Sequence, residues 1–249
     1  MNLTQAPRHR EHPWHERTAG AKHHQWFSRL VSLHELTQGW LKELQVERPG
    51  HLITRGLKPQ VSQNLWMLDF LTRPGSKTGP SMDSLLDDTS PEDILGRLEH
   101  TVWSVQAWTL MSCVERAPAD ARQALESILE QSSWKLGRKH GEAAWPGLPE
   151  HARQDLRTLL LALSPHLVSG TGGDEFLLKR AVRSEVQIEL KSCPHRSRYL
   201  ETAPIADLLC RLHAQWMRGF VYALNSKVTV EHLIGKAPHR CLQRWFYLA

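Results

Sequence analysis

The last third of the chain alternates apolar and polar positions, whereas the preceding residues place apolar side chains three or four residues apart. Spacing of three and four is typical of an amphipathic helix, and alternation is typical of a half-buried strand. The first predicted helix begins near Trp26. Its apolar residues are Trp26, Phe27, Leu30, Val31, Leu33, Trp40, Leu41 and Leu44.

Prolines and glycines divide the helical part into further segments. Ser90 and Pro91 form a good helix start, because serine caps the first turn and proline suits the first helical position. Further helices are predicted over residues 61–73, 90–115, 120–144 and 150–163, with a loop over 74–90 and a flexible connection over 169–175.

Three strands and one helix are predicted in the C-terminal part. In EVQIELKSC, which begins at Glu185, apolar residues alternate with polar ones. The segments KVTVEHLI and HRCLQRWFYL are joined by GKAP (235–238), a four-residue hairpin loop. A helix over Ala203–Leu224 separates the first strand from this hairpin. Helices followed by an antiparallel unit predict an α+β fold.

We predict one domain over residues 25–249, mainly helical over 25–168 and strand–helix–hairpin over 176–249. Residues 1–24 are predicted to be a disordered tail, because they hold too little apolar surface to offset the entropy of ordering. This tail is rich in histidine, so metal binding is the alternative interpretation. The histidines are His9, His12, His15, His23 and His24.

Composition and charge narrow the class of protein. The chain has 249 residues and 41% hydrophobic content, enough for one large domain. It lacks the run of about 18 apolar residues that a membrane span needs, and its N-terminus lacks the apolar segment of a secretory signal, so we expect a cytoplasmic protein. The formal net charge is +5 and the pI is near 9.2, but the basic residues are scattered. We therefore expect surface charge and no nucleic-acid partner.

Three of the four cysteines lie after residue 190, and each has a histidine two or three residues away. The first pair ends a predicted strand, the second shares a helix face, and the third shares a strand face. These side chains converge if the helix packs on the sheet. The pairs are Cys193 with His195, Cys210 with His213, and Cys241 with His239.

Three interpretations of these pairs stay open. Thiolates and imidazoles suit zinc, or an iron–sulfur cluster where thiolates dominate. A thiol beside an imidazole is also an activated nucleophile. Burial in the core is the third, because cysteine is among the most buried residue types. The candidate catalytic residues are Cys193, His195 and Cys241, and the candidate metal ligands are Cys193, Cys210, His213, His239 and Cys241.

Tryptophan is abundant, with ten residues in the chain. Trp216 and Trp245 belong to the C-terminal unit. Such side chains either fill the core or line an apolar small-molecule pocket. We take Trp216 and Trp245 as candidate ligand-binding residues.

Residues 185–248 resemble the 4-vinyl reductase domain and the related L-2-amino-thiazoline-4-carboxylic acid hydrolase-like family. The similar features are a strand ending in SCP with Cys193, a helix with Cys210, and a closing strand with Cys241 after Gly235. The chain departs from the family pattern at His213, where the hydrolase-like proteins often have an acidic residue.

The resemblance implies an α+β fold that binds small or hydrophobic ligands between helices and sheet, in some members as a homodimer. It implies a small-molecule hydrolase that uses the cysteine and histidine residues, with or without a metal. A sensor domain that binds a small ligand or a metal without catalysis is the alternative.

Overall fold

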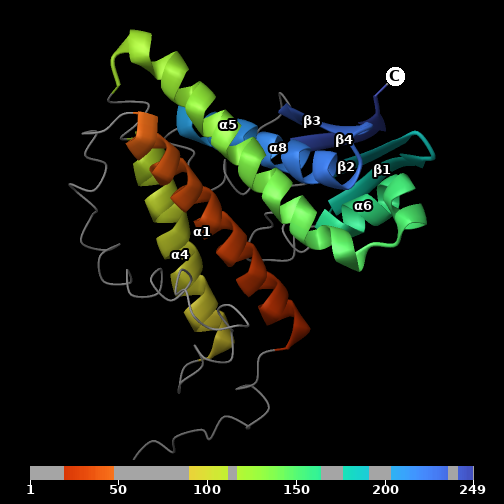
Figure 1. Ribbon diagram of the computed structural model, residues 1–249. Helices are drawn as coiled ribbons and strands as arrows, with labels where there is room; N and C mark the ends of the chain where they lie inside the picture. Colours follow the sequence, from red (N-terminus) through yellow and green to blue (C-terminus); the bar gives the residue numbers. More distant parts are fainter. Residues whose placement is uncertain are drawn as a thin grey trace, which may run out of the picture.

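The computed structural model describes residues 20–47, 90–111, 117–163, 176–190, 203–234 and 241–248, and within them it has an α+β fold, as predicted (Figure 1). The α-helices are α1 (Ala21–Glu47), α4 (Pro91–Leu110), α5 (Ala119–Ala144), α6 (Leu156–Leu163) and α8 (Ala203–Leu224). Two short 3-10 helices, η4 (Trp145–Gly147) and η5 (Glu150–Gln154), follow α5. The strands are β1 (Phe176–Val182), β2 (Glu185–Leu190), β3 (Val228–Ile234) and β4 (Cys241–Tyr247).

The four strands form one antiparallel sheet in the order β1-β2-β4-β3. The predicted pairing of the last two strands is confirmed, and β2 pairs with β4 from Glu185 opposite Phe246 to Leu190 opposite Cys241. The pattern of residues does not predict β1, because FLLKRAV lacks a clean alternation and its register with β2 shifts between Leu178 and Arg180.

The N-terminal helix begins earlier than predicted. α1 starts at Ala21, so the prediction of a tail through residue 24 is wrong for its last four residues. The physical reason is a tertiary contact, because the buried His23 places Nε2 2.6 Å from Oε1 of Glu92 on α4. Residues 1–19 and the predicted helix over 61–73 lie outside the described residues.

The predicted start at Ser90 is confirmed, because its Oγ accepts a hydrogen bond from the Asp93 backbone N–H at 3.2 Å. The predicted helix over 150–163 is instead divided. Asp155 interrupts it, and its carboxylate accepts hydrogen bonds from the backbone N–H and hydroxyl of Thr158 at 3.0 and 2.8 Å. The Asp155 side chain therefore caps α6 and separates it from η5.

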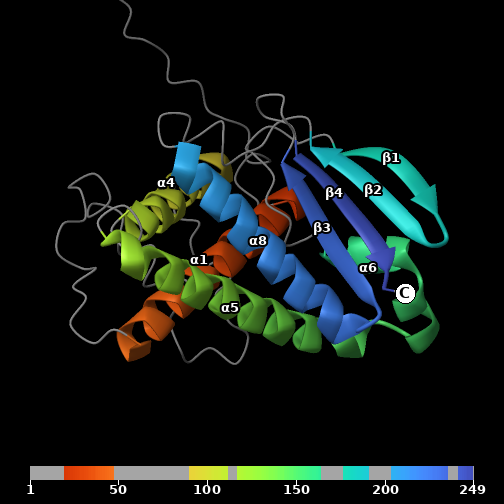
Figure 2. The ribbon, with the colours of Figure 1, turned by 90° about the horizontal axis from the view of Figure 1, so that it is seen from above.

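Helix α8 lies between α5 and the sheet, and it contacts α5 and β3 (Figure 2). α1 packs against α4 and α5 at the side of α5 away from the strands (Figures 1 and 2). Among the described helices, none combines the length and the apolar content that crossing a bilayer requires.

The contact between α5 and α8 brings the two backbones together at glycine positions. A Cβ at Gly137 would lie 1.9 Å from the Trp216 carbonyl oxygen, and one at Gly141 would lie 2.3 Å from that of Phe220. From the other side, a Cβ at Gly219 would lie 2.1 Å from the Trp134 carbonyl oxygen. Because backbone atoms fill these places, the observed helix spacing requires glycine at these positions.

Polar contacts tie α1 to both of its neighbours. The Trp40 Nε1–H donates to Ser133 Oγ on α5 at 2.8 Å, and the Gln106 Nε2–H on α4 donates to the Leu33 carbonyl oxygen at 2.9 Å. Glu35 lies 2.7 Å from His140 Nε2 on α5. These contacts fix α1 against both helices.

We expect Gly137→Ala to destabilise the protein by about 3 kcal/mol or more, because the new methyl group meets a backbone carbonyl that cannot rotate away. The matched control is Gly96→Ala on α4, where nothing lies within 4 Å of the added Cβ. This control should stabilise the protein by about 0.5–1 kcal/mol, the usual gain for alanine over glycine in a helix. Urea unfolding of both variants checks the prediction, and equal effects would contradict the close contact.

We expect the Glu35–His140 pair to make stability fall in acid. The hydrogen bond from His140 holds the pKa of the Glu35 carboxyl below its ordinary value of 4.5. The unfolded chain then takes up this proton at a higher pH than the folded chain, so the stabilisation is present above pH 4.5 and is lost as pH falls. In urea unfolding, Glu35→Gln should be less stable than wild type at about pH 6, and the difference should be smaller at about pH 3. A constant difference at both pH values would contradict it.

Candidate functional site

Four of the residues predicted to form the site have described side chains. Cys210, His213 and Trp216 lie on α8, and Trp245 lies on β4. The predictions for Cys193, His195 and His239 fall outside the described residues. Cys241 is described through its backbone alone, as the first residue of β4, opposite Leu190 on β2 and Ile234 on β3.

Cys210 and His213 are both buried on α8. The His213 ring meets the Trp103 ring of α4 edge to face, with 6.3 Å between their centroids. Trp103 in turn donates its Nε1–H to Oε1 of Glu99 at 3.2 Å, and that carboxylate is buried as well. A carboxylate, an indole and an imidazole thus follow one another between α4 and α8.

Glu99 and Trp103 are not among the site residues predicted from the sequence. A signal was available, because the two residues are four apart and therefore share one face of the predicted helix over 90–115. The contact with His213 had no such signal, since it joins residues that are distant in the chain. Cys210 and His213 are two of the five predicted metal ligands, and in the described part of the chain no three His, Cys, Asp or Glu side chains gather as a metal site.

Trp216 belongs to the helix contact. Its ring lies 5.8 Å from that of His140 on α5 and 5.5 Å from that of Phe220, measured between centroids. Its carbonyl oxygen occupies the place of a Cβ at Gly137. The structure therefore places the predicted ligand-binding residue Trp216 against α5, where it packs the two helices together.

Trp245 lies on the inner face of the sheet. It pairs with Val186 on β2 and Val230 on β3, and all three side chains are fully buried. Two residues earlier, Gln243 occupies the same face with 4% of its surface exposed. The indole Nε1–H of Trp245 and the side-chain Oε1 of Gln243 are buried, and neither finds a hydrogen-bond partner in the described structure.

These two polar groups form the candidate site, because a buried donor and a buried acceptor are rarely left unmatched. Sequence reasoning found Trp245 but missed Gln243. The alternation in CLQRW puts Cys241, Gln243 and Trp245 on one face of the strand, and that is the signal that identifies Gln243.

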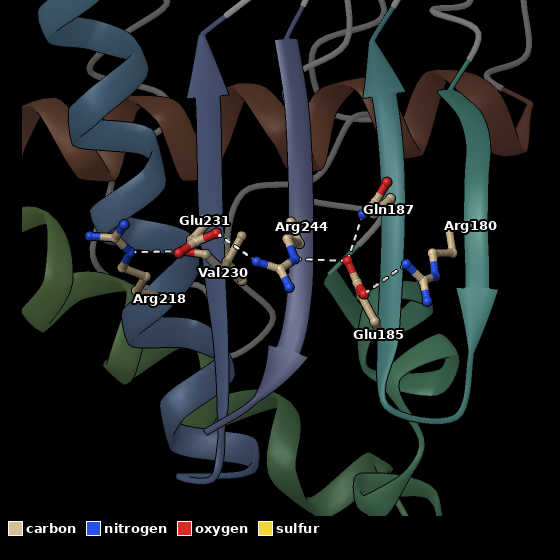
Figure 3. A network of polar contacts seen from close by, with 7 residues as sticks. All are labelled: Arg180, Glu185, Gln187, Arg218, Val230, Glu231 and Arg244. Carbon is tan, nitrogen blue, oxygen red and sulfur yellow. Dashed lines mark hydrogen bonds and ion pairs between the residues drawn. The ribbon is translucent and has the colours of Figure 1, made fainter. Parts of the chain in front are cut away.

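The outer face of the sheet carries a charge network centred on Glu185 (Figure 3). Its Oε1 accepts hydrogen bonds from Gln187 and, at 2.7 Å, from Nε of Arg244, and its Oε2 lies 3.5 Å from Arg180. Arg244 reaches Glu231 on β3 at 3.4 Å. The bonds from Gln187 and Arg244 lower the pKa of Glu185, and the bond to Glu185 raises that of Arg244.

Each charge of this network has an opposite charge beside it, and the contacts link all four strands. We therefore assign it to strand pairing, because cross-strand charge pairs stabilise one register. At the outer edge, Arg218 on α8 donates its Nε–H to the Val230 carbonyl oxygen at 2.8 Å (Figure 3). That bond occupies one carbonyl of the edge strand β3.

Comparison with protein-family models, curated proteins and solved structures finds no match for this chain. The resemblance to the 4-vinyl reductase and hydrolase-like families therefore stays a prediction. The site must be interpreted from its own residues.

Gln243→Met should leave stability unchanged or raise it by about 1 kcal/mol, because methionine fills a similar volume without a buried carbonyl to satisfy. The matched control is Gln106→Met. Gln106 is also buried with an unmatched Oε1, but its Nε2–H donates to the Leu33 carbonyl oxygen, and losing that bond should cost about 1 kcal/mol or more. Urea unfolding of both variants tests this. A loss at Gln243 as large as that at Gln106 would mean that Gln243 serves the fold.

Proposed function

We propose that this chain is a small-molecule-binding domain that holds its ligand against the inner face of the sheet. The observation that supports the proposal is the pair of polar groups on β4, the Trp245 Nε1–H and the Gln243 Oε1, which are buried without a hydrogen-bond partner in the described residues. Leaving such a group unmatched costs about 1–3 kcal/mol. A ligand that accepts from Trp245 and donates to Gln243 recovers that free energy.

The surroundings of these groups limit the ligand's chemistry. Across the strands they face Val186, Ile188 and Val230, which are buried and apolar, and His232, which pairs with Gln243 on β3. Most of the wall is therefore apolar. The Cα atoms of two residues on one strand face are about 7 Å apart, which matches the size of a small molecule. We therefore expect a neutral, mostly apolar ligand with one acceptor and one donor, such as an amide or a heterocycle.

The resemblance to the 4-vinyl reductase domain implies the same location, between helices and sheet. The proposal rests on Trp245 and Gln243 and does not depend on that resemblance. Binding without catalysis was the alternative function in the sequence analysis, and the unmatched polar pair on β4 favours it.

Hydrolysis by a cysteine nucleophile, with or without a metal, stays a prediction from the sequence. Its central residues Cys193 and His195 lie outside the described residues, as does the side chain of Cys241. A hydrolase of the suggested family would turn over 2-amino-thiazoline-4-carboxylate and lose that turnover in Cys193→Ser while keeping its fold.

The binding proposal is tested by a thermal-shift screen with neutral heterocyclic amides on the full chain. At ten times its Kd a ligand stabilises the folded state by about 1.4 kcal/mol, which should raise Tm by about 3–6 °C. Gln243→Met and Trp245→Phe should lose this shift, because each removes one of the two polar groups.

The matched control is Gln106→Met, which alters a buried glutamine on α4 and should keep the ligand-induced shift. A hit that shifts Tm equally in wild type and in both β4 variants would contradict the proposed site. A complete screen without any hit would overturn the proposal.

A further inference from the structure

A second polar site lies at the C-terminal end of α8, away from the inner face of the sheet. It is a surface pocket of about 740 Å³ between η4, η5, the β1–β2 turn and the end of β4. Its walls combine basic and aromatic side chains. They are Arg153, Arg183, Lys227, Trp145, Tyr222 and Tyr247.

The charges of this pocket are unbalanced. Three cations, Arg153, Arg183 and Lys227, line it, against the single carboxylate of Glu150. None of the three cations forms an ion pair with a carboxylate in the described residues, whereas Arg244 on the sheet has two acidic partners. The end of α8 contributes about half a negative charge, which offsets only part of the excess.

Arg153 is held in place by groups that leave its charge uncompensated. Its Nε–H donates to the Leu148 carbonyl oxygen at 3.0 Å and its Nη2–H to that of Trp145 at 3.2 Å. The guanidinium carbon lies 3.4 Å from the centroid of the Trp145 ring. Carbonyl dipoles and an aromatic face orient this cation, but they do not neutralise it.

Hydrogen bonds between elements fix the shape of the pocket before any ligand binds. The Tyr247 hydroxyl donates to the Gln154 carbonyl oxygen, and the Asn225 Nδ2–H donates to that of Arg153 at 2.9 Å. Burial raises the pKa of Tyr247 above its ordinary value of 10.0, so this hydroxyl stays protonated and keeps its bond. A preformed site loses less entropy when it binds.

The aromatic side chains supply an apolar surface next to the cations. Tyr222 is 46% exposed and Trp145 is 42% exposed, which is high for side chains of this size. Flat, exposed rings beside guanidinium groups suit a ligand that combines a planar ring with a negative charge.

We propose that this basic–aromatic pocket binds a small planar molecule that carries a phosphate or a carboxylate. The acidic group contacts Arg183 and Lys227, and the ring lies against Tyr222. The proposal is independent of the ligand proposed for the inner face, because the two sites share no residue.

The test is isothermal titration calorimetry on the full chain with phenyl phosphate, benzoate, inorganic phosphate and benzyl alcohol. Phenyl phosphate or benzoate should bind at least about tenfold more tightly than benzyl alcohol, which lacks the charge, and the stronger of the two identifies the acidic group. Inorganic phosphate should bind more weakly than phenyl phosphate, because it lacks the ring.

The double variant Arg183→Glu/Lys227→Glu should weaken binding by about tenfold or more, since two attractive charges become repulsive. The matched control is Lys42→Glu/Lys139→Glu, which makes the same charge change at exposed positions on α1 and α5. This control should keep the affinity of wild type within about twofold. Circular dichroism should show both double variants folded.

Equal weakening in both double variants would overturn the proposal, because net charge alone would then explain binding. Equal affinity for benzyl alcohol and phenyl phosphate would show that the cations do not contribute to binding. If no charged probe binds, the proposal is wrong. Gln243→Met should bind phenyl phosphate like wild type, so failure here and failure of the inner-face proposal are distinguishable.

Discussion

The close contact between α5 and α8 is the constraint on which the arrangement of the other elements depends. At Gly137 and Gly141 of α5 and at Gly219 of α8, a carbonyl oxygen of the partner helix occupies the place where a Cβ would stand. Because the two backbones are so close, a larger side chain at these positions would push the helices apart. α1 packs against α5 and α4 packs against α1, while β3 of the sheet packs against α8, so the helices and the sheet meet through this pair.

This position makes α8 a buried helix with different neighbours on its different sides. Trp216 packs toward α5, and His213 meets Trp103 of α4. Arg218 reaches the edge strand β3. One helix therefore connects the helical layer to the sheet, and Trp216, His213 and Arg218 each face a different neighbour.

The distribution of charge separates structural from binding surfaces. On the outer face of the sheet, Glu185 and Arg244 lie among partners of opposite charge, and the contacts stabilise strand register. At the end of α8, Arg153 contacts carbonyl oxygens and the Trp145 ring, and none of the three cations forms an ion pair with a carboxylate in the described residues. On the inner face, Gln243 and Trp245 are neutral and buried. The outer face therefore serves strand pairing. The end of α8 suits the anionic ligand that we propose there, and the inner face suits the proposed neutral ligand.

The sequence by itself determined the α+β class, the capped start of α4, the extent of α5 to within one residue, and the pairing of β3 with β4, because these follow from local periodicity and, for α4, from capping. It also identified Trp245 as a candidate ligand-binding residue. Tertiary structure decided the rest. α1 begins at Ala21 because His23 meets Glu92 of another helix, and β1 forms because β2 offers it an edge, contacts that local spacing does not encode. Segments distant in the chain leave the Gln243 Oε1 without a hydrogen-bond partner in the described residues, and they bring Arg153, Arg183 and Lys227 into one pocket. Local sequence does not encode either arrangement.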